Sequence, residues 1–289
     1  MIDRKVPGIP WVIVSGHPGA GKSTLAASGK NGYCFDTEPP GSAALYPAHQ
    51  YTSFAFEPKQ YEKIVHAVDK LKVDFSYNSA EQCLENEITK IGYLVIDTFD
   101  TLQKTLLTAY LKQKKDVFGD KARPNMKIPA GGLWAPKADF NDWGQLRDIQ
   151  APLIFSLKEL PIPVVWVAHS KVIPPVYKPW GDLQNRGAVI FDIAGSIEEW
   201  IVNLCDFNLV VLITDPPITK KSDNEPNGTQ FGIRVVYTQL CIEKDIMISG
   251  KDRLGLFRDM NVMSWTYKLD AQGQPVNKPL DRIFQAYEY

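Results

Sequence analysis

The sequence has few cysteines, almost no net charge and no long apolar run, and each shortage excludes a class of protein. Its 289 residues carry 32 basic and 33 acidic side chains, so no global field favours nucleic acid or a membrane surface. A local basic strip would still be enough for DNA binding. No run approaches ~18 apolar residues, and the first fifteen residues show no secretion signal. We therefore expect a cytoplasmic protein that does not span a membrane.

The few cysteines and histidines also exclude the common structural metal sites. None of the four cysteines forms a C-x-x-C pair, and the four histidines include no H-x-x-x-H pair. The cysteine spacing is typical of reduced core residues in a cytoplasmic protein rather than of disulfides. These cysteines are Cys34, Cys83, Cys205 and Cys241.

Short β-rich runs alternate with helical patterns, which predicts an α/β fold with a mostly parallel central sheet and helices on both faces. The expected strands are 11–15, 33–36, 93–97, 164–168, 208–213 and 233–238. The expected helices are 61–71, a second one from Ser79 to about 90, 98–112, 142–160 with a kink or division at Pro152, and 197–204. Long loops are expected at 112–140 and 171–188, and an exposed hairpin connection at 215–229.

Residues 16–23 read GHPGAGKS, a full match to the phosphate-binding loop G-x-x-x-x-G-K-[ST]. An apolar strand precedes the loop and a helix start follows it, which is the context that this loop requires. Backbone N–H groups would surround the phosphates, Lys22 would reach the β- and γ-phosphates, and the Ser23 hydroxyl would bind Mg²⁺. We therefore expect ATP and Mg²⁺ as cofactors. The predicted nucleotide-binding residues are Gly16, His17, Pro18, Gly19, Ala20, Gly21, Lys22, Ser23 and Thr24.

Two carboxylates complete the expected nucleotide site. Asp97 ends the buried run YLVID, a Walker B pattern, and is predicted to bind the metal together with Ser23. Glu38 follows the strand after the P-loop helix and is the candidate base that orients the attacking water. The alternative for Glu38 is a plain acidic turn before Pro39, in which case Asp97 or Asp100 is next in line as the base.

The order of these motifs resembles the RecA-like recombinase and helicase core, and most specifically the phage single-strand-annealing ATPases known as the fourth Sak family. The resemblance rests on GHPGAGKST at 16–24, FDTEPPG at 35–41, YLVIDTFDTL at 93–102, WGQLRD at 143–148, VAHSK at 167–171 and KDRLGL at 251–256. It spans residues 9–260. It implies a RecA-like ATPase core over residues 1–260 and leaves residues 261–289 as a C-terminal tail outside the core.

The resemblance also implies roles for later residues. His169 stands where the family carries its γ-phosphate sensor, which in true recombinases is usually Gln, so strand exchange stays open. Lys251 and Arg253 resemble the motif that reaches a neighbouring subunit's triphosphate, which implies a homo-oligomer, ring or filament. The implied partners are single-stranded DNA and a single-strand-binding protein, in the host cytoplasm if the protein is phage-encoded.

In RecA-like proteins two loops hold single-stranded DNA, and the two long irregular stretches fall where those loops would be. Basic side chains interleaved with aromatic ones suit a groove that tracks phosphates and stacks bases. The second stretch supplies the predicted DNA-binding residues Lys171, Tyr177, Lys178, Trp180 and Arg186. The first offers Lys112, Lys114, Lys115, Lys121, Arg123, Lys127 and Trp134.

Two further functions stay open beside an ATP-dependent, DNA-binding annealing protein. One is a RecA-like ATPase that acts as a regulatory or assembly switch without touching DNA. The other is a small P-loop kinase, although its lid would normally carry several arginines, whereas the stretch 112–140 has only Arg123.

Overall fold

The structure is a computed structural model of the whole chain. It describes residues 6–39, 41–55, 57, 59–81, 91–118, 140–173, 176–177, 183–185, 187–192, 197–220, 229–243, 246–257, 262–264 and 279–288. Among these residues, no helix is both long and apolar enough to cross a bilayer. Cys34 and Cys205 are free and buried, as expected from their spacing.

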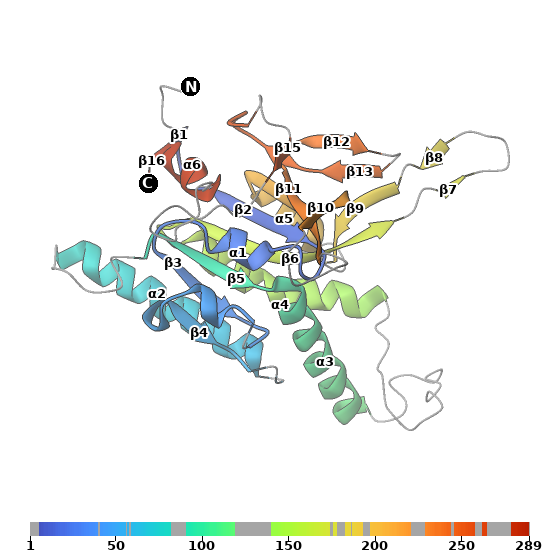
Figure 1. Cartoon of the computed structure of the whole chain (residues 1–289). Helices are drawn as coiled ribbons and strands as arrows, with labels where there is room; N and C mark the ends of the chain where they lie inside the picture. The colour runs from blue at the N-terminus through green and yellow to red at the C-terminus, as the bar shows by residue number, and fades with distance from the viewer. Residues whose placement is uncertain are drawn as a thin grey trace.

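A six-stranded parallel sheet forms the centre of the molecule, in the order β4-β3-β5-β6-β2-β10 (Figure 1). Beyond β10, the strands β11 and β15 continue the sheet in antiparallel pairing. The predicted mostly parallel α/β fold is therefore confirmed. The bounds are β2 Trp11–Gly16, β3 Gly32–Asp36, β4 Tyr51–Ser53, β5 Tyr93–Asp97, β6 Val164–Ile173, β10 Phe207–Lys220, β11 Thr229–Tyr237 and β15 Val262–Ser264.

The strand β6 belongs to two pairings. Its first residues lie between β5 and β2 in the parallel sheet, and residues 170–173 pair antiparallel with β9 (Gly187–Phe191). The strands β13 (Ile246–Ser249) and β12 (Leu240–Glu243) extend this branch. The expected loop 171–188 is therefore partly wrong, because it also contains the small hairpin of β7 (Val176–Tyr177) and β8 (Leu183–Asn185).

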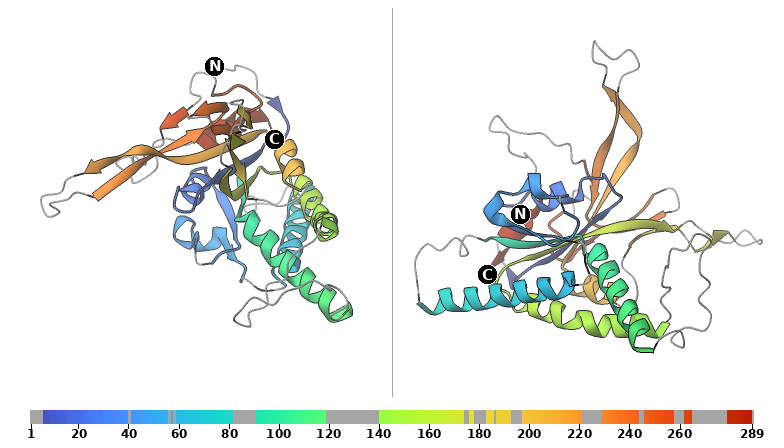
Figure 2. Two further views of the ribbon diagram at one scale, coloured as in Figure 1. Left: turned by 90° about the vertical axis from the view of Figure 1, so that its right-hand side faces the viewer. Right: turned by 90° about the horizontal axis from the view of Figure 1, so that it is seen from below.

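Helices cover both faces of the sheet because successive strand residues point to opposite sides. Trp11 and Ile13 pack with α2, α3, α4 and α5 in one core, whereas Val12 and Val14 pack with α1 and α6 in the other. Figure 2 shows the helices of the first core, α2, α3, α4 and α5, together on one side of the sheet. The bounds are α1 Lys22–Ala26, α2 Gln60–Glu81, α3 Phe99–Phe118, α4 Phe140–Lys158, α5 Ile197–Leu204 and α6 Pro279–Gln285.

Three helices differ from the prediction. Ser79 does not begin a new helix but lies inside α2. No glycine or proline interrupts α2 before this point, and its residues Leu71 and Phe75, which pack on the core, are one turn apart. Pro152 does not divide α4, because buried side chains on both sides of it, such as Leu146 and Leu157, hold the helix against the sheet. The helix α3 runs six residues beyond its predicted end at Lys112, to Phe118.

The hairpin of β10 and β11 projects from the body of the sheet (Figure 2). Its strands are longer than predicted, since β10 continues through Asp215 to Lys220. The register shifts between Thr214 and Ile218, where the sequence has two consecutive prolines. Proline has no N–H to donate to a neighbouring strand, so a bulge at this point is expected.

The last described segment packs on the same core as the P-loop helix. Phe284 in α6 lies against Tyr93, with ring centroids 5.0 Å apart, and Asp281 accepts a hydrogen bond of 2.8 Å from the backbone N–H of Lys30. The strand β16 (Tyr287–Glu288) pairs with β1 (Val6–Pro7). The division of the chain at residue 260 stays a prediction.

Candidate nucleotide-binding site

The carboxyl ends of the parallel strands bring the predicted site residues to one edge of the sheet. Gly16, the first residue of the P-loop, is the register partner of His169 across β2 and β6. Asp36 and Asp97 are register partners across β3 and β5. Residues more than 150 positions apart in the sequence therefore lie side by side.

Glycines shape the P-loop at two points. Gly21 has φ +95° and is the N-cap of α1, a left-handed conformation that residues with a side chain rarely adopt. A Cβ on Gly16 would lie 2.3 Å from the carbonyl oxygen of Val211 in the adjacent strand β10. The close approach of these two strands therefore requires glycine at the start of the loop.

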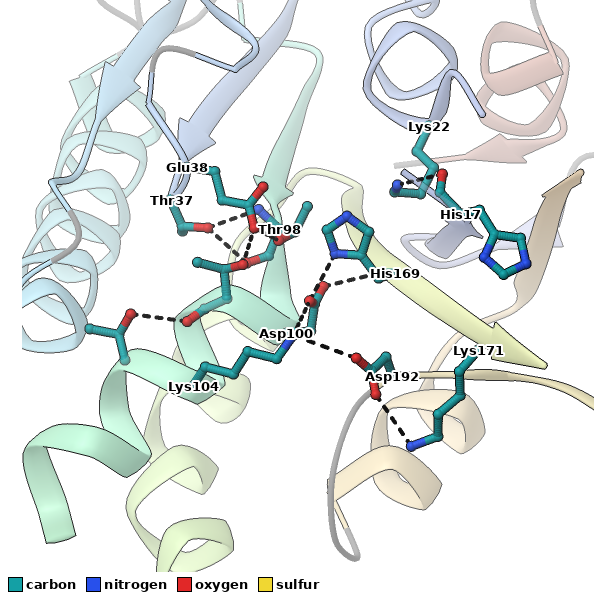
Figure 3. Close-up of polar contacts among 12 residues, drawn as sticks. His17, Lys22, Thr37, Glu38, Thr98, Asp100, Lys104, His169, Lys171 and Asp192 are labelled. Atoms are coloured by element: carbon teal, nitrogen blue, oxygen red, sulfur yellow. Dashed lines mark hydrogen bonds and ion pairs between the residues drawn. The ribbon is translucent and has the colours of Figure 1, made fainter. Parts of the chain in front are cut away.

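Lys22 is buried, and its Nζ donates a hydrogen bond of 3.1 Å to the carbonyl oxygen of His17 (Figure 3). Burial lowers the pKa of Lys22, and the nearby carboxylates of Asp97, Asp100 and Glu38 act in the opposite direction. A triphosphate in the loop would pair with this ammonium and so offset the cost of burying its charge.

Asp97 is buried and accepts hydrogen bonds from the hydroxyls of Ser42 and Ser23. Burial raises the pKa of Asp97, and these two hydrogen bonds oppose the shift. A hydroxyl beside a carboxylate is the hard oxygen donor set that Mg²⁺ prefers, so Ser23 and Asp97 fit the predicted metal. When bound, the ion would neutralise charge on the phosphates. The Asp97–Thr98 peptide bond is cis.

Glu38 is exposed, but its carboxylate is held in place. Its Oε1 accepts hydrogen bonds from the hydroxyls of Thr98, at 3.2 Å, and of Thr101. The backbone on either side is also fixed, because the Thr37 hydroxyl donates to the Thr98 carbonyl at 2.8 Å. An acidic turn without a role would not need this support, so the geometry favours a positioned carboxylate.

Asp36 builds the turn that carries Glu38. Its carboxylate accepts hydrogen bonds from the backbone N–H of Glu38, at 2.8 Å, and of Ser42, at 3.1 Å. The hydroxyl of Tyr51 in β4 donates to the same carboxylate at 2.5 Å. One buried side chain therefore fixes both Glu38 and the serine that contacts Asp97.

His169 lies on β6 at the same edge, and Figure 3 shows its ring between Glu38 and Lys22. Its Nδ1 is 2.9 Å from Oδ2 of Asp100, and its backbone N–H donates to Oδ1 at 3.0 Å. Lys104 donates to the same carboxylate at 3.2 Å and contacts Asp192 at 3.5 Å. The expected sensor position is thus part of a polar chain that the motifs did not reveal.

Lys251 and Arg253 are not at this edge. Both reach backbone carbonyls at the C-terminal end of α5, where cations are favoured by the helix dipole. Lys251 donates to Val202 and Cys205, at 2.9 and 2.6 Å, and Arg253 forms an ion pair of 2.8 Å with Asp206. Asp206, which lies outside the KDRLGL motif, is therefore the carboxylate partner of Arg253.

The predicted DNA-binding residues are only partly described. Lys171 is exposed on β6 and pairs with Asp192 at 3.3 Å, and Tyr177 lies in β7. Lys178, Trp180 and Arg186 lie outside the described residues. In the first stretch, Lys112, Lys114 and Lys115 belong to α3, and Lys121, Arg123, Lys127 and Trp134 lie outside the described residues.

A protein-family model described as an AAA domain matches residues 10–173, more than half of the chain. The chain belongs to this AAA domain family. The match runs from the start of the P-loop strand to the end of β6, so it contains Lys22, Glu38, Asp97 and His169 but not Lys251 or Arg253. The matched segment has the predicted α/β fold with a mostly parallel sheet and a P-loop, whereas membership of the single-strand-annealing family stays a prediction.

Among solved structures, the AAA domain protein is similar to the crystal structure of the RadB recombinase. The two share 15% sequence identity over 85% of this chain and 92% of that chain, with a TM-score of 0.36. No curated protein matches the sequence.

The sequence predicted no role for three supporting residues of the AAA domain site, and for a fourth, Asp100, only an alternative role as the base. The hydroxyl of Ser42 donates to Asp97, and the hydroxyl of Tyr51 donates to Asp36. The hydroxyl of Thr101 donates to Glu38, and the carboxylate of Asp100 contacts the ring of His169. Only Asp100 carried a signal in the sequence, because it follows Asp97 by three residues at the start of a predicted helix. Ser42 and Tyr51 lie outside the quoted motifs, and Thr101 lies inside YLVIDTFDTL but at a position to which no role was given.

Proposed function

We propose that this protein is a Mg²⁺-dependent ATPase that binds single-stranded DNA and promotes the annealing of complementary strands. ATP would be bound at the strand edge described above and hydrolysed at subunit interfaces of a homo-oligomer. A single-strand-binding protein would present the DNA.

The convergence of five side chains at one sheet edge carries the ATPase part of the proposal. Lys22 would hold the β- and γ-phosphates, and Ser23 with Asp97 would hold Mg²⁺. The fixed carboxylate of Glu38 would accept a proton from the attacking water, and His169 would contact the terminal phosphate.

The course of β6 supports the DNA part. The strand passes directly from His169 at the nucleotide edge to Lys171 and then toward the β7–β8 hairpin, which lies in the predicted DNA-binding stretch. Only one residue separates the sensor position from the first predicted DNA contact. A change at the terminal phosphate would therefore have a short covalent path to the DNA.

The rate of ATP hydrolysis with and without single-stranded DNA tests the proposal. We expect hydrolysis that needs Mg²⁺ and rises when single-stranded DNA is added, and pairing of complementary strands that depends on ATP. Equal rates with and without DNA would favour a regulatory or assembly ATPase. Turnover only in the presence of a small acceptor would favour a kinase.

A triple variant tests the DNA-binding stretch. Neutralising Lys171, Lys178 and Arg186 together should weaken binding and lower the salt dependence, since each phosphate contact releases counterions and contributes about 0.7 to the logarithmic slope for single strands. The matched control replaces three exposed lysines, which should change neither quantity: Lys59 just before α2, and Lys63 and Lys70 within it. Equal affinity and slope in both triple variants would remove this stretch from the proposal.

A further inference from the structure

Asp100 is a fully buried carboxylate that no motif of the nucleotide site explains. It lies in the first turn of α3, and its relative exposure is 0%. Burying a charged carboxylate is unfavourable unless donors surround it. Here the donors are the backbone N–H and ring Nδ1 of His169 and the ammonium of Lys104. Two of the three donors therefore belong to the residue at the sensor position.

The contact with Asp100 decides which nitrogen of His169 carries the proton. An ionised carboxylate only accepts hydrogen bonds, so Nδ1 must be the protonated nitrogen. Burial would raise the pKa of Asp100, but the hydrogen bonds from His169 and the charge of Lys104 outweigh it and lower the pKa to about 2. Asp100 is therefore ionised at neutral pH, and Nδ1–H is fixed.

A neutral ring with its proton on Nδ1 has only a lone pair on Nε2. The oxygens of a triphosphate also carry only lone pairs, so this neutral ring cannot donate to them. An imidazolium carries protons on both nitrogens and can bind the carboxylate and a phosphate together. The amide of a glutamine sensor, in contrast, donates a hydrogen bond at any pH.

We propose that Asp100 is a positioning residue that holds His169 as an imidazolium, with Nε2–H available to the terminal phosphate of a bound nucleoside triphosphate. The inference rests on the proposed ATPase function and specifies how its sensor works. The sensor then requires a proton, and the site distinguishes a triphosphate from a diphosphate through an ionic contact.

Two carboxylates lie beside His169. Glu38 at the end of β3 and Asp100 on α3 both face it, and donor atoms of the three side chains lie within 4.8 Å of one another. The positive charge of Lys104 is partly balanced, because its ammonium forms ion pairs with both Asp100 and Asp192. Among the described residues, the other charged groups near this region are Lys22 in the P-loop, Asp97 at the end of β5 and Lys171 on β6.

The same three side chains could instead be considered as ligands of a cation. Both oxygens of Asp100, however, already accept hydrogen bonds from N–H donors. Oε1 of Glu38 accepts from two threonine hydroxyls. The contacts therefore favour a hydrogen-bonded set around a protonated ring.

NMR titration of the histidine rings in the nucleotide-free protein tests the pairing without relying on activity. The chain has four histidines, and the His169 signals are assigned as those lost in His169→Gln. In Asp100→Asn the titration midpoint of His169 should fall by about one pH unit or more, because the opposite charge is gone. The control Asp148→Asn, on the exposed side of α4, should leave the midpoint unchanged. An unchanged midpoint in Asp100→Asn would overturn the proposal.

Nucleotide binding tests the second contact of the ring. A slowly hydrolysed ATP analogue should raise the titration midpoint of His169, and ADP should not, because only the analogue offers a terminal phosphate. Equal midpoints with the two nucleotides would overturn the role of Nε2. If neither nucleotide binds, the proposed ATPase function fails, while the titration of the nucleotide-free protein still decides the pairing with Asp100.

The pH profile of ATP turnover gives a readout that a merely structural role would not move. The wild-type rate should fall as pH rises through the His169 midpoint, and Asp100→Asn should shift this fall to lower pH. His169→Gln should lack the fall, and adding Asp100→Asn to it should produce no further shift. Identical profiles for the wild type and His169→Gln would contradict the proposal.

Discussion

Arg253 and Asp206 form an ion pair at the end of the sheet opposite to the P-loop. Asp206 also accepts a hydrogen bond of 3.2 Å from the backbone N–H of Trp11, the first residue of β2, whereas the P-loop begins at Gly16, the last residue of that strand. Strand β2 has six residues and separates the two ends by about 17 Å. Arg253 is therefore out of reach of the P-loop in its own chain.

A catalytic role for Arg253 would thus require a second copy of the chain. In that case Arg253→Ala should bind ATP normally and lose hydrolysis by about 10³-fold, because a cation supplied by a neighbour stabilises the transition state. Asp206→Asn removes the same ion pair but keeps the cation, and should retain hydrolysis. ATPase assays of both variants, below their unfolding temperatures, provide the measurement.

Mixing two inactive variants gives the corresponding control. Arg253→Ala combined with Glu38→Gln should recover part of the activity, because some interfaces pair an intact glutamate with an intact arginine. If Arg253→Ala and Asp206→Asn lose stability alike and both keep full turnover, the ion pair serves the fold alone.

Lys22→Ala should weaken ATP binding by about 10- to 100-fold, because it removes charge-assisted hydrogen bonds worth about 1.5–3 kcal/mol. Calorimetric titration with ATP measures this loss, and circular dichroism checks that the fold is kept. The matched control is Lys30→Ala, an exposed lysine just beyond the P-loop helix, which should bind as the wild type does. Wild-type affinity in a folded Lys22→Ala protein would contradict the assignment.

Glu38→Gln should bind ATP normally but hydrolyse it about 10²–10⁴-fold more slowly, because the amide cannot accept a proton from water. The substitution keeps an oxygen for the hydroxyls of Thr98 and Thr101, so the side chain should stay in place. Single-turnover hydrolysis measures the effect, and Glu62→Gln on the exposed side of α2 is the control. Unchanged turnover in Glu38→Gln would assign the base elsewhere.

Asp97→Asn should stabilise the nucleotide-free protein at neutral pH. Burial raises the pKa of Asp97 above its ordinary value of 3.8, so the folded chain binds this proton more tightly than the unfolded chain. Stability is therefore lost as pH rises from the unfolded toward the folded pKa, and the substitution removes that loss. We expect a gain of about 1 kcal/mol, or roughly 2 °C in Tm, at pH 7.

Thermal unfolding of Asp97→Asn between pH 5 and pH 8 checks this expectation. The gain should shrink as the pH falls toward the ordinary pKa of a carboxyl group, since both states of the wild type are then protonated. Binding of Mg²⁺ with ATP should be weakened in the same variant. An equal or lower Tm at all pH values would contradict the assigned cost of burying this carboxylate.

The parts of the fold that follow local rules were predictable. Strand β5 has the predicted bounds, the P-loop strand is one residue longer than predicted, and a helix follows the P-loop as predicted. Apolar runs and the GKS motif are local signals. The pairing of Gly16 with His169 was not readable from the sequence. It depends on which strands become neighbours, and that is decided by the packing of the whole sheet.

The contacts of the supporting side chains were likewise not predictable from the sequence. Ser42 contacts Asp97 across 55 positions of sequence, and its segment has neither a motif nor a periodic pattern. Likewise, the partner of Arg253 could not be inferred, because Asp206 stands 47 positions earlier between a helix and a strand. Contacts of this kind come from tertiary packing, which local patterns do not record.

The packing of α6 on the P-loop helix has a consequence for the order of folding. A helix of five residues, as α1 is, has little stability of its own and depends on what covers it. Its cover includes Leu280 and Phe284, and the bond from Lys30 to Asp281 closes a loop of 251 positions. During synthesis, the phosphate-binding loop leaves the ribosome about 250 residues before α6 does. Its helix is buried completely only after α6 has been made and has docked, so a nucleotide bound in the loop would stabilise the fold only from that stage onward.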